Sequence, residues 1–148
     1  MSSTTQGAQR SLRYLLSGTP YSGISDNYLY IHLSTTDIAT DGSGATTPVG
    51  NYTMVYALRS ADFWNITDDD VISNAVEFDF ISNDNYGASS NWGTLKEIFI
   101  SIDGGVSASS IQYHQALIPN IPVNTGTRVV VPVGSLTIKR DSSSYQTV

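Results

Sequence analysis

Hydrophobic and polar positions alternate with a period of two through most of the middle of this chain. Residues 28–33 read YLYIHL, which places Leu29, Ile31 and Leu33 on one side of an extended backbone. Such alternation indicates a β-strand with one buried face. The same pattern recurs in residues 52–58, 76–80, 94–102, 111–117, 128–133 and, briefly, 136–138. The sequence therefore predicts seven or so short strands.

Turn and loop signals separate these strands. Polar loops lie at 34–50 and 82–91, and glycine turns at 103–105 and 124–126. Pro119 and Pro122 should hold their stretch at a sheet edge or in a connection, because proline donates no ladder hydrogen bond. Short strands at this spacing, with almost no helix, are typical of an all-β fold, an antiparallel β-sandwich or jelly-roll-like domain. We expect this domain to span residues 27–141 and a polar C-terminal tail to occupy 142–148.

The N-terminal part follows a different pattern. The first ten residues are polar and aperiodic, and Leu12, Leu15 and Leu16 then follow the spacing of one helical turn. We therefore predict an N-terminal arm with a short docking turn over residues 1–26. Its candidate partner contacts are Arg10, Leu12, Arg13, Leu15 and Leu16. The start of the chain carries no apolar core of a secretory signal.

Composition narrows the function classes. The chain has 148 residues and a mass of 15.9 kDa, which suits one domain. Seven Lys and Arg against thirteen Asp and Glu give a net charge of −6, which argues against a nucleic-acid partner. The absence of cysteine excludes disulfides and thiolate sites. No apolar run is long enough to predict a membrane span, so we expect no membrane partner.

Carboxylates offer two candidate sites. Glu77 and Asp79 lie two apart on a predicted strand, at a separation that a glycoside hydrolase could use. The simpler interpretation is a solvated outer face opposite Val76, Phe78 and Phe80. Calcium could be held by Asp37, Asp41 and the run 68–70. None of these fits a calcium-loop pattern, so we expect no metal site.

The histidines and aromatic residues give no catalytic pattern. His32 and His114 lie opposite the apolar faces of their predicted strands, where surface or interface hydrogen bonding is the ordinary role. No nucleophile elbow accompanies them. Trp64, Tyr86 and Tyr113 are candidate exposed aromatics for stacking on a sugar, although such residues are more often core or interface anchors. We therefore expect no catalytic residue, no cofactor and no enzyme.

Four motifs make residues 28–141 similar to a family of small tailed-phage virion proteins. In order they are YLYIHLSTTDIATDGSG, YTMVYALR, NAVEFDF followed by NWGTLKEIFISID, and VNTGTRVVVPVGSLTIKRD. The spacing of Trp92-Gly93-Thr94 to Gly126 and to the closing segment 134–138 is the most specific of them. The resemblance covers roughly three-quarters of the chain. One departure is Lys96-Glu97, where small neutral residues are commoner.

The resemblance implies a non-enzymatic structural protein of a bacteriophage virion, assembled in the cytoplasm of the bacterial host. Family members look like capsid decoration (cement) proteins or like tail and fibre components. We favour decoration, with the major capsid protein or other virion subunits as partners and self-association into a trimer or other cyclic oligomer. The arm up to about Ser17 would pair with a neighbour, and Arg10 and Arg13 would meet acidic capsid surface. The alternative is a tail, baseplate or fibre module that binds host-surface glycan.

Overall fold

The computed structural model describes residues 2–3, 28–66, 71–81 and 87–139. Within these ranges the chain forms strands, turns and loops and no helix, so no helix there is long and apolar enough to cross a membrane. The strands are β1 (Ser2–Ser3), β2 (Tyr28–Ser34), β3 (Val55–Leu58), β4 (Trp64–Ile66), β5 (Val71–Asn74), β6 (Phe78–Asp79), β7 (Gly93–Ser101), β8 (Ile111–Val123), β9 (Val130–Val131) and β10 (Thr137–Lys139).

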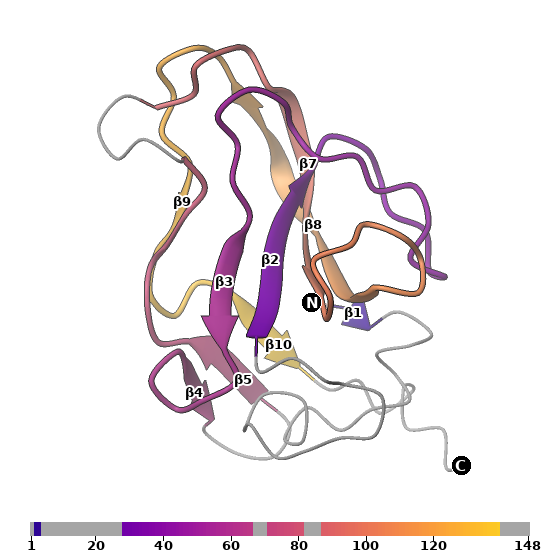
Figure 1. Cartoon of the computed structure of the whole chain (residues 1–148), viewed down its shortest axis with the longest axis vertical. Helices are drawn as coiled ribbons and strands as arrows, with labels where there is room; N and C mark the ends of the chain where they lie inside the picture. The colour runs from indigo at the N-terminus through magenta and orange to yellow at the C-terminus, as the bar shows by residue number, and fades with distance from the viewer. Residues whose placement is uncertain (1, 4–27, 67–70, 82–86, 140–148) are drawn as a thin grey trace.

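The largest sheet is antiparallel and has the order β1-β8-β7-β2-β3. Its long strands β2, β7 and β8 run side by side in Figure 1. Ile31 pairs with Ile100 and Leu33 with Ile98. Because side chains alternate across a strand, this register gathers the apolar residues of both strands on one face of the sheet.

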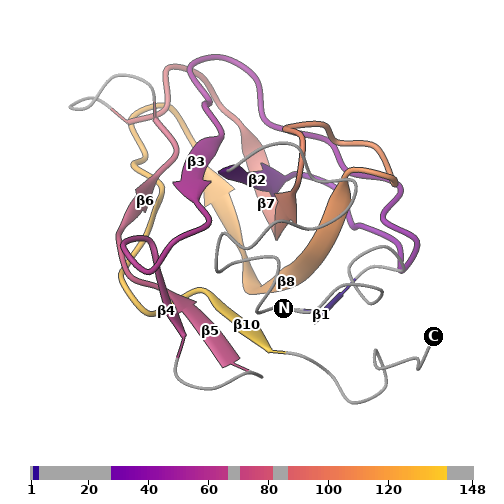
Figure 2. The ribbon, with the colours of Figure 1, turned by 60° about the horizontal axis from the view of Figure 1, so that its bottom comes forward.

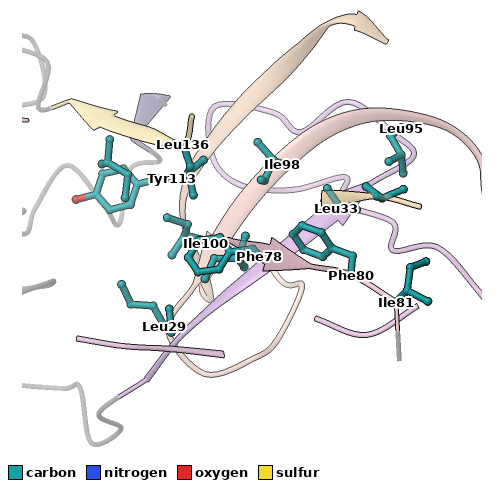
Figure 3. Packing of buried hydrophobic residues seen from close by; sticks show 14 of the residues in the cluster. Leu29, Leu33, Phe78, Phe80, Ile81, Leu95, Ile98, Ile100, Tyr113 and Leu136 are labelled. Atoms are coloured by element: carbon teal, nitrogen blue, oxygen red, sulfur yellow. The ribbon is translucent and has the colours of Figure 1, made fainter. Parts of the chain in front are cut away.

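Two smaller antiparallel sheets face that apolar surface, one in the order β10-β5-β4 and one formed by β6 and β9. Figure 2 shows β4, β5 and β10 together beside the large sheet. The main core draws residues from all three sheets, and Figure 3 shows its packing. Its largest fully buried side chains are Trp64, Tyr113, Phe78, Phe80, Leu29, Ile31, Leu33 and Ile72.

The opposite face of the large sheet is covered by two of the chain's own loops. The loop after β2 and the loop between β7 and β8 lie together on one side of the sheet in Figures 1 and 2. Ile38 packs there on Phe99 and Ile111, with Ala45 beside them. Gly42, at φ +90°, approaches so closely that a Cβ atom would lie 3.0 Å from the carbonyl oxygen of Ala108. A glycine suits both the backbone conformation and this contact.

The predicted all-β fold is confirmed. The strands predicted at 28–33 and 94–102 occur almost as expected, whereas those at 52–58, 76–80 and 128–133 pair over much shorter lengths. The strand predicted at 111–117 continues to Val123 despite its prolines, and β4 and β5 were not predicted. The sandwich or jelly-roll-like arrangement stays a prediction. The docking turn and the C-terminal tail lie outside the described residues.

Candidate functional site

Two of the three candidate exposed aromatics are buried, so that prediction is wrong for them. Trp64 is 1% exposed, and its indole Nε1 donates a hydrogen bond to the Leu58 carbonyl at 3.0 Å. Its ring meets Phe78 edge-on at a centroid distance of 5.8 Å. Tyr113 is 2% exposed and belongs to the main core. Its place among apolar residues at alternate positions of 111–117 was the signal for this burial.

The remaining candidate contacts lie outside the described residues. They are Tyr86, Arg10, Leu12, Arg13, Leu15 and Leu16. Their predicted roles stay predictions.

Asp79 is engaged in structural contacts. One carboxylate oxygen accepts a hydrogen bond from Arg128 Nη2 at 2.7 Å, and the other accepts one from the Ile81 amide at 3.1 Å. Glu77 is exposed, whereas Phe78 and Phe80 are buried. This arrangement matches the simpler interpretation of an outer face opposite the core.

The described candidate calcium ligands are engaged in local contacts. Asp41 accepts hydrogen bonds from the Ser43 hydroxyl at 2.7 Å and the Ser43 amide at 2.9 Å, which lower the pKa of Asp41. Asp37 lies 3.4 Å from Lys96 Nζ on the surface. In the described ranges no three His, Cys, Asp or Glu side chains gather where they could hold a metal ion. The acidic run 68–70 lies outside those ranges.

His32 is buried, contrary to the surface role expected for it. Its ring stacks on Phe99 at 4.8 Å with 5° between the planes. The Tyr52 hydroxyl accepts a hydrogen bond from the Leu33 amide at 3.0 Å and lies 3.3 Å from His32 Nδ1. Burial raises the pKa of Tyr52, so its proton stays on the hydroxyl. We therefore assign Tyr52 as the donor to Nδ1 and place the imidazole proton on Nε2.

Burial also lowers the pKa of His32, from 6.5 to about 4. Between these values the unfolded chain binds a proton that the folded protein does not, so stability falls as the pH falls from 6.5 to 4. We expect a loss on the order of 2–3 kcal/mol, because each pKa unit corresponds to about 1.4 kcal/mol. Urea unfolding across this range should show it. A His32→Phe variant keeps a ring against Phe99 but cannot bind the proton. Its free energy of unfolding should therefore depend less on pH between 4 and 6.5, by the uptake of one proton. An unchanged dependence on pH would show that burial of His32 is not its cause.

A buried carboxylate joins the large sheet to the loop that covers it. Glu97 on β7 accepts a hydrogen bond from the Ile38 amide at 2.8 Å through Oε1. Its Oε2 lies 2.7 Å from Nδ1 of His114 on β8. Both side chains are largely buried. The pair therefore anchors a loop to the sheet rather than presenting a base to solvent.

Sequence reasoning missed this pair. Lys96-Glu97 stood out only as a departure from a family pattern. One available signal was an acidic residue directly before the apolar run Ile98–Ile100 of a strand, since a buried carboxylate there needs a partner.

An apolar groove opens between the β7–β8 part of the large sheet and the segment that carries β9 and leads to β10. It encloses about 160 Å³, and Leu33, Leu95, Ile98 and Leu136, labelled in Figure 3, belong to its lining. The rest of its lining is Gln115, Leu117, Ile121, Val129, Val130, Val131, Pro132 and Ser135. None of these side chains is titratable, so the groove offers no acid, base or nucleophilic carboxylate.

A bulge in β8 stands beside this groove. Leu95 pairs with Ile121 and Glu97 with Ala116, so residues 117–120 lie opposite Lys96 alone. Four residues against one force the β8 backbone outward. Ile118 at this bulge is 91% exposed, the largest value among the exposed large hydrophobic residues of the described chain.

Three tyrosines gather at the paired ends of β2 and β3. Tyr56 meets Tyr30 edge-on at 5.3 Å and Tyr28 at 6.3 Å. Tyr56 is 52% exposed, and Tyr28 is also exposed. This tyrosine cluster, rather than Trp64 or Tyr113, is the exposed aromatic surface of the described residues.

The described residues therefore present an apolar groove, a protruding bulge and a tyrosine cluster, and the largely buried Glu97 and His114 are engaged in anchoring a loop. A scan against protein-family models finds no family that matches the chain, and a search of curated proteins finds no match either.

Proposed function

We propose that this chain is a non-enzymatic structural protein of a tailed-phage virion, a capsid decoration (cement) protein that binds and stabilises the head shell. With this we propose a sandwich or jelly-roll-like arrangement of its sheets. Its partners are the major capsid protein or other virion subunits and further copies of itself in a cyclic oligomer. It adds buried area across subunit junctions and so slows opening of the shell.

The outer edge of β8 is the observation that carries this proposal. Ser2 and Ser3, which precede β8 by more than a hundred positions in the sequence, pair with His114 and Tyr113 on that edge. The edge thus accepts a strand from a distant segment, the mode of attachment known as β-augmentation. Beyond this short pairing, residues 117–123 continue without a charged side chain. Such a surface suits a protein that other subunits cover.

Charge and chemistry also support a structural role. Asp79 is paired with Arg128, and Glu97 is enclosed with His114 and the loop amide of Ile38. The groove is lined by residues that cannot carry out acid–base chemistry. The net charge of −6 favours the outside of a DNA container over contact with the DNA.

Sedimentation with purified head shells of the phage that encodes the chain tests the proposal. We expect the full chain to sediment with the shells and a variant lacking residues 1–17, including the β1 strand, to stay in the supernatant. A variant lacking only 142–148 is the matched control and should still bind. Circular dichroism establishes that both truncated chains are folded.

Two outcomes would contradict this picture in different ways. Unchanged shell affinity without residues 1–17 would refute the role of the arm while leaving decoration intact. Failure of the full chain to bind shells, together with an averaged particle image that places it on the tail, would refute decoration.

The tyrosine cluster favours a second candidate, a tail, baseplate or fibre module that binds host-surface glycan. Exposed aromatic rings offer apolar faces with a polar edge, which suits contact with a sugar ring. Binding of the isolated protein to a glycan array, lost in Tyr56→Ala, would favour this alternative over decoration.

A further inference from the structure

We propose that His32 and Tyr52 form an acid-sensitive latch, which holds the edge of β2 to the segment that carries β6 and releases it when the imidazole is protonated. The latch opens while the rest of the fold persists. It does not depend on the proposed capsid role, because a protein that binds no shell could still contain it. Failure of the latch and failure of shell binding are therefore separate results.

Tyr52 connects the large sheet to the segment that carries β6. Its backbone forms an antiparallel bridge with Ile81, and its ring stacks on Phe80 at a centroid distance of 6.3 Å. The pairing of β2 with β3 ends at Ile31. Beyond that point the Leu33 amide donates to the Tyr52 hydroxyl at 3.0 Å. The phenol oxygen thus takes the place of a ladder carbonyl at this edge of the sheet.

The latch requires a neutral imidazole. The Tyr52 hydroxyl lies 3.3 Å from Nδ1 of His32 and donates its proton there, while its oxygen accepts from the Leu33 amide. A proton on Nδ1 would turn this acceptor into a second donor that faces the same oxygen. The phenol proton would then lose its acceptor in a buried place, and such a loss is costly.

The surroundings of His32 also disfavour a charged ring. The ring stacks on Phe99 of β7 at 4.8 Å. Its Nε2 approaches the backbone of Gly104, in the loop between β7 and β8, without a well-formed hydrogen bond among the described residues. The carboxylates of the neighbouring elements in the described chain already have partners: Glu97 with His114, Asp103 with Ser110, and Asp37 with Lys96.

Acid should therefore shift the balance toward an open form. Burial lowers the pKa of His32 from 6.5 to about 4, and the Gly104 backbone opposes this only in part. Exposure to solvent restores the ordinary value, so between pH 6.5 and pH 4 the open form binds a proton that the closed form does not. The ratio of closed to open form should fall on the order of 100-fold from pH 7 to pH 4, since each pKa unit is a factor of ten.

Contacts between side-chain protons, measured by NMR over a series from pH 7 to pH 4, test the latch. At pH 7 the His32 ring should show contacts with Phe99 and Tyr52. We expect these contacts to be lost with a midpoint between pH 6.5 and pH 4, whereas the contact between Trp64 and Phe78 remains. Dilute samples avoid precipitation near the isoelectric point of about 4.5.

Two variants separate the latch from a general effect of acid. His32→Phe keeps a ring against Phe99 but cannot be protonated, so the contact between the rings at positions 32 and 99 should be the same at pH 7 and pH 4. Tyr52→Phe keeps the ring on Phe80 but removes the donor to Nδ1. Because that hydrogen bond favours the neutral imidazole, the ring of His32 should titrate closer to pH 6.5 in this variant.

His114→Asn is the matched control, because it removes the other histidine and keeps an amide donor for Glu97. Its contacts around His32 should be lost over the same pH range as in the wild type. The proposal is overturned if the contacts of His32 persist at pH 4, if they are lost equally in His32→Phe, or if His114→Asn abolishes the transition. Loss of the contact between Trp64 and Phe78 at the same pH would also overturn it, because acid would then unfold the whole chain.

Discussion

Replacing Trp64 with alanine should destabilise the fold by about 3–5 kcal/mol, the range for a large aromatic side chain removed from a packed core. Trp64 is almost completely buried, packs against Phe78 and donates its indole hydrogen bond to the Leu58 carbonyl. Truncation therefore leaves a cavity and removes one of two hydrogen bonds to this carbonyl, which still accepts from the Ser60 amide at 2.9 Å. Urea unfolding followed by circular dichroism measures the change in the free energy of unfolding.

Tyr56→Ala is the control, since it removes a half-exposed ring with two edge-on neighbours. Its cost should stay below that of Trp64→Ala, because each of its two aromatic pairs contributes about 0.5–1.5 kcal/mol. Equal losses in the two variants would show that Trp64 is not a core residue. The comparison also matters for function, because any loss of partner binding in Trp64→Ala would then reflect unfolding rather than a missing contact.

Replacing Glu97 with alanine should cost about 2–6 kcal/mol, because it takes the acceptor from two largely buried partners and each buried group left unsatisfied costs about 1–3 kcal/mol. The change removes the acceptor of the Ile38 amide and the partner of His114 at once. We also expect the Ile38 amide to exchange its hydrogen much faster with solvent, because the loop after β2 loses this attachment to the sheet. Chemical unfolding and hydrogen exchange measure the two effects separately.

Lys96→Ala is the neighbouring control on the same strand. Its ammonium lies 3.4 Å from an exposed Asp37, and exposed pairs contribute about 1 kcal/mol or less. Glu97→Gln should give an intermediate loss, because it keeps one oxygen for the amide. If Glu97→Ala cost no more than Lys96→Ala, the carboxylate would not be anchoring the loop.

The longest strands could be predicted from sequence because their own alternation carries the information. In residues 28–34 one face carries Leu29, Ile31 and Leu33, and the second half of 93–101 carries Ile98 and Ile100 on one face. Burial of such a face fixes both strand and register. The short strands β4 and β5 have no such pattern. Their place depends on Asn74, whose side chain donates to the Pro132 and Val76 carbonyls and accepts from the Leu136 amide. Pro132 and Leu136 are distant from Asn74 in sequence, so local alternation could not reveal these contacts.

The features of the candidate site were harder to predict than the strands, because they depend on residues that are far apart in the sequence. The burial of Glu97 requires an amide 59 positions earlier in the chain. Pro119 and Pro122 were expected at a sheet edge or in a connection. Both lie in β8, and there the described chain pairs with β8 only on the β7 side, with Pro122 paired to Thr94. Trp64 was assigned to the surface because its segment looked like a loop, and the small sheet that encloses it forms only when residues 71–74 and 137–139 come together.

The pairing of β1 with β8 also sets an order of events during folding. Ser2 lies 112 residues before its partner His114 in the sequence. Contacts of such long sequence separation form late in folding. The edge is completed by whichever N-terminal strand reaches it first, its own or that of a neighbouring copy. At high local concentration, the final step of folding and the first step of assembly therefore compete for the same backbone groups.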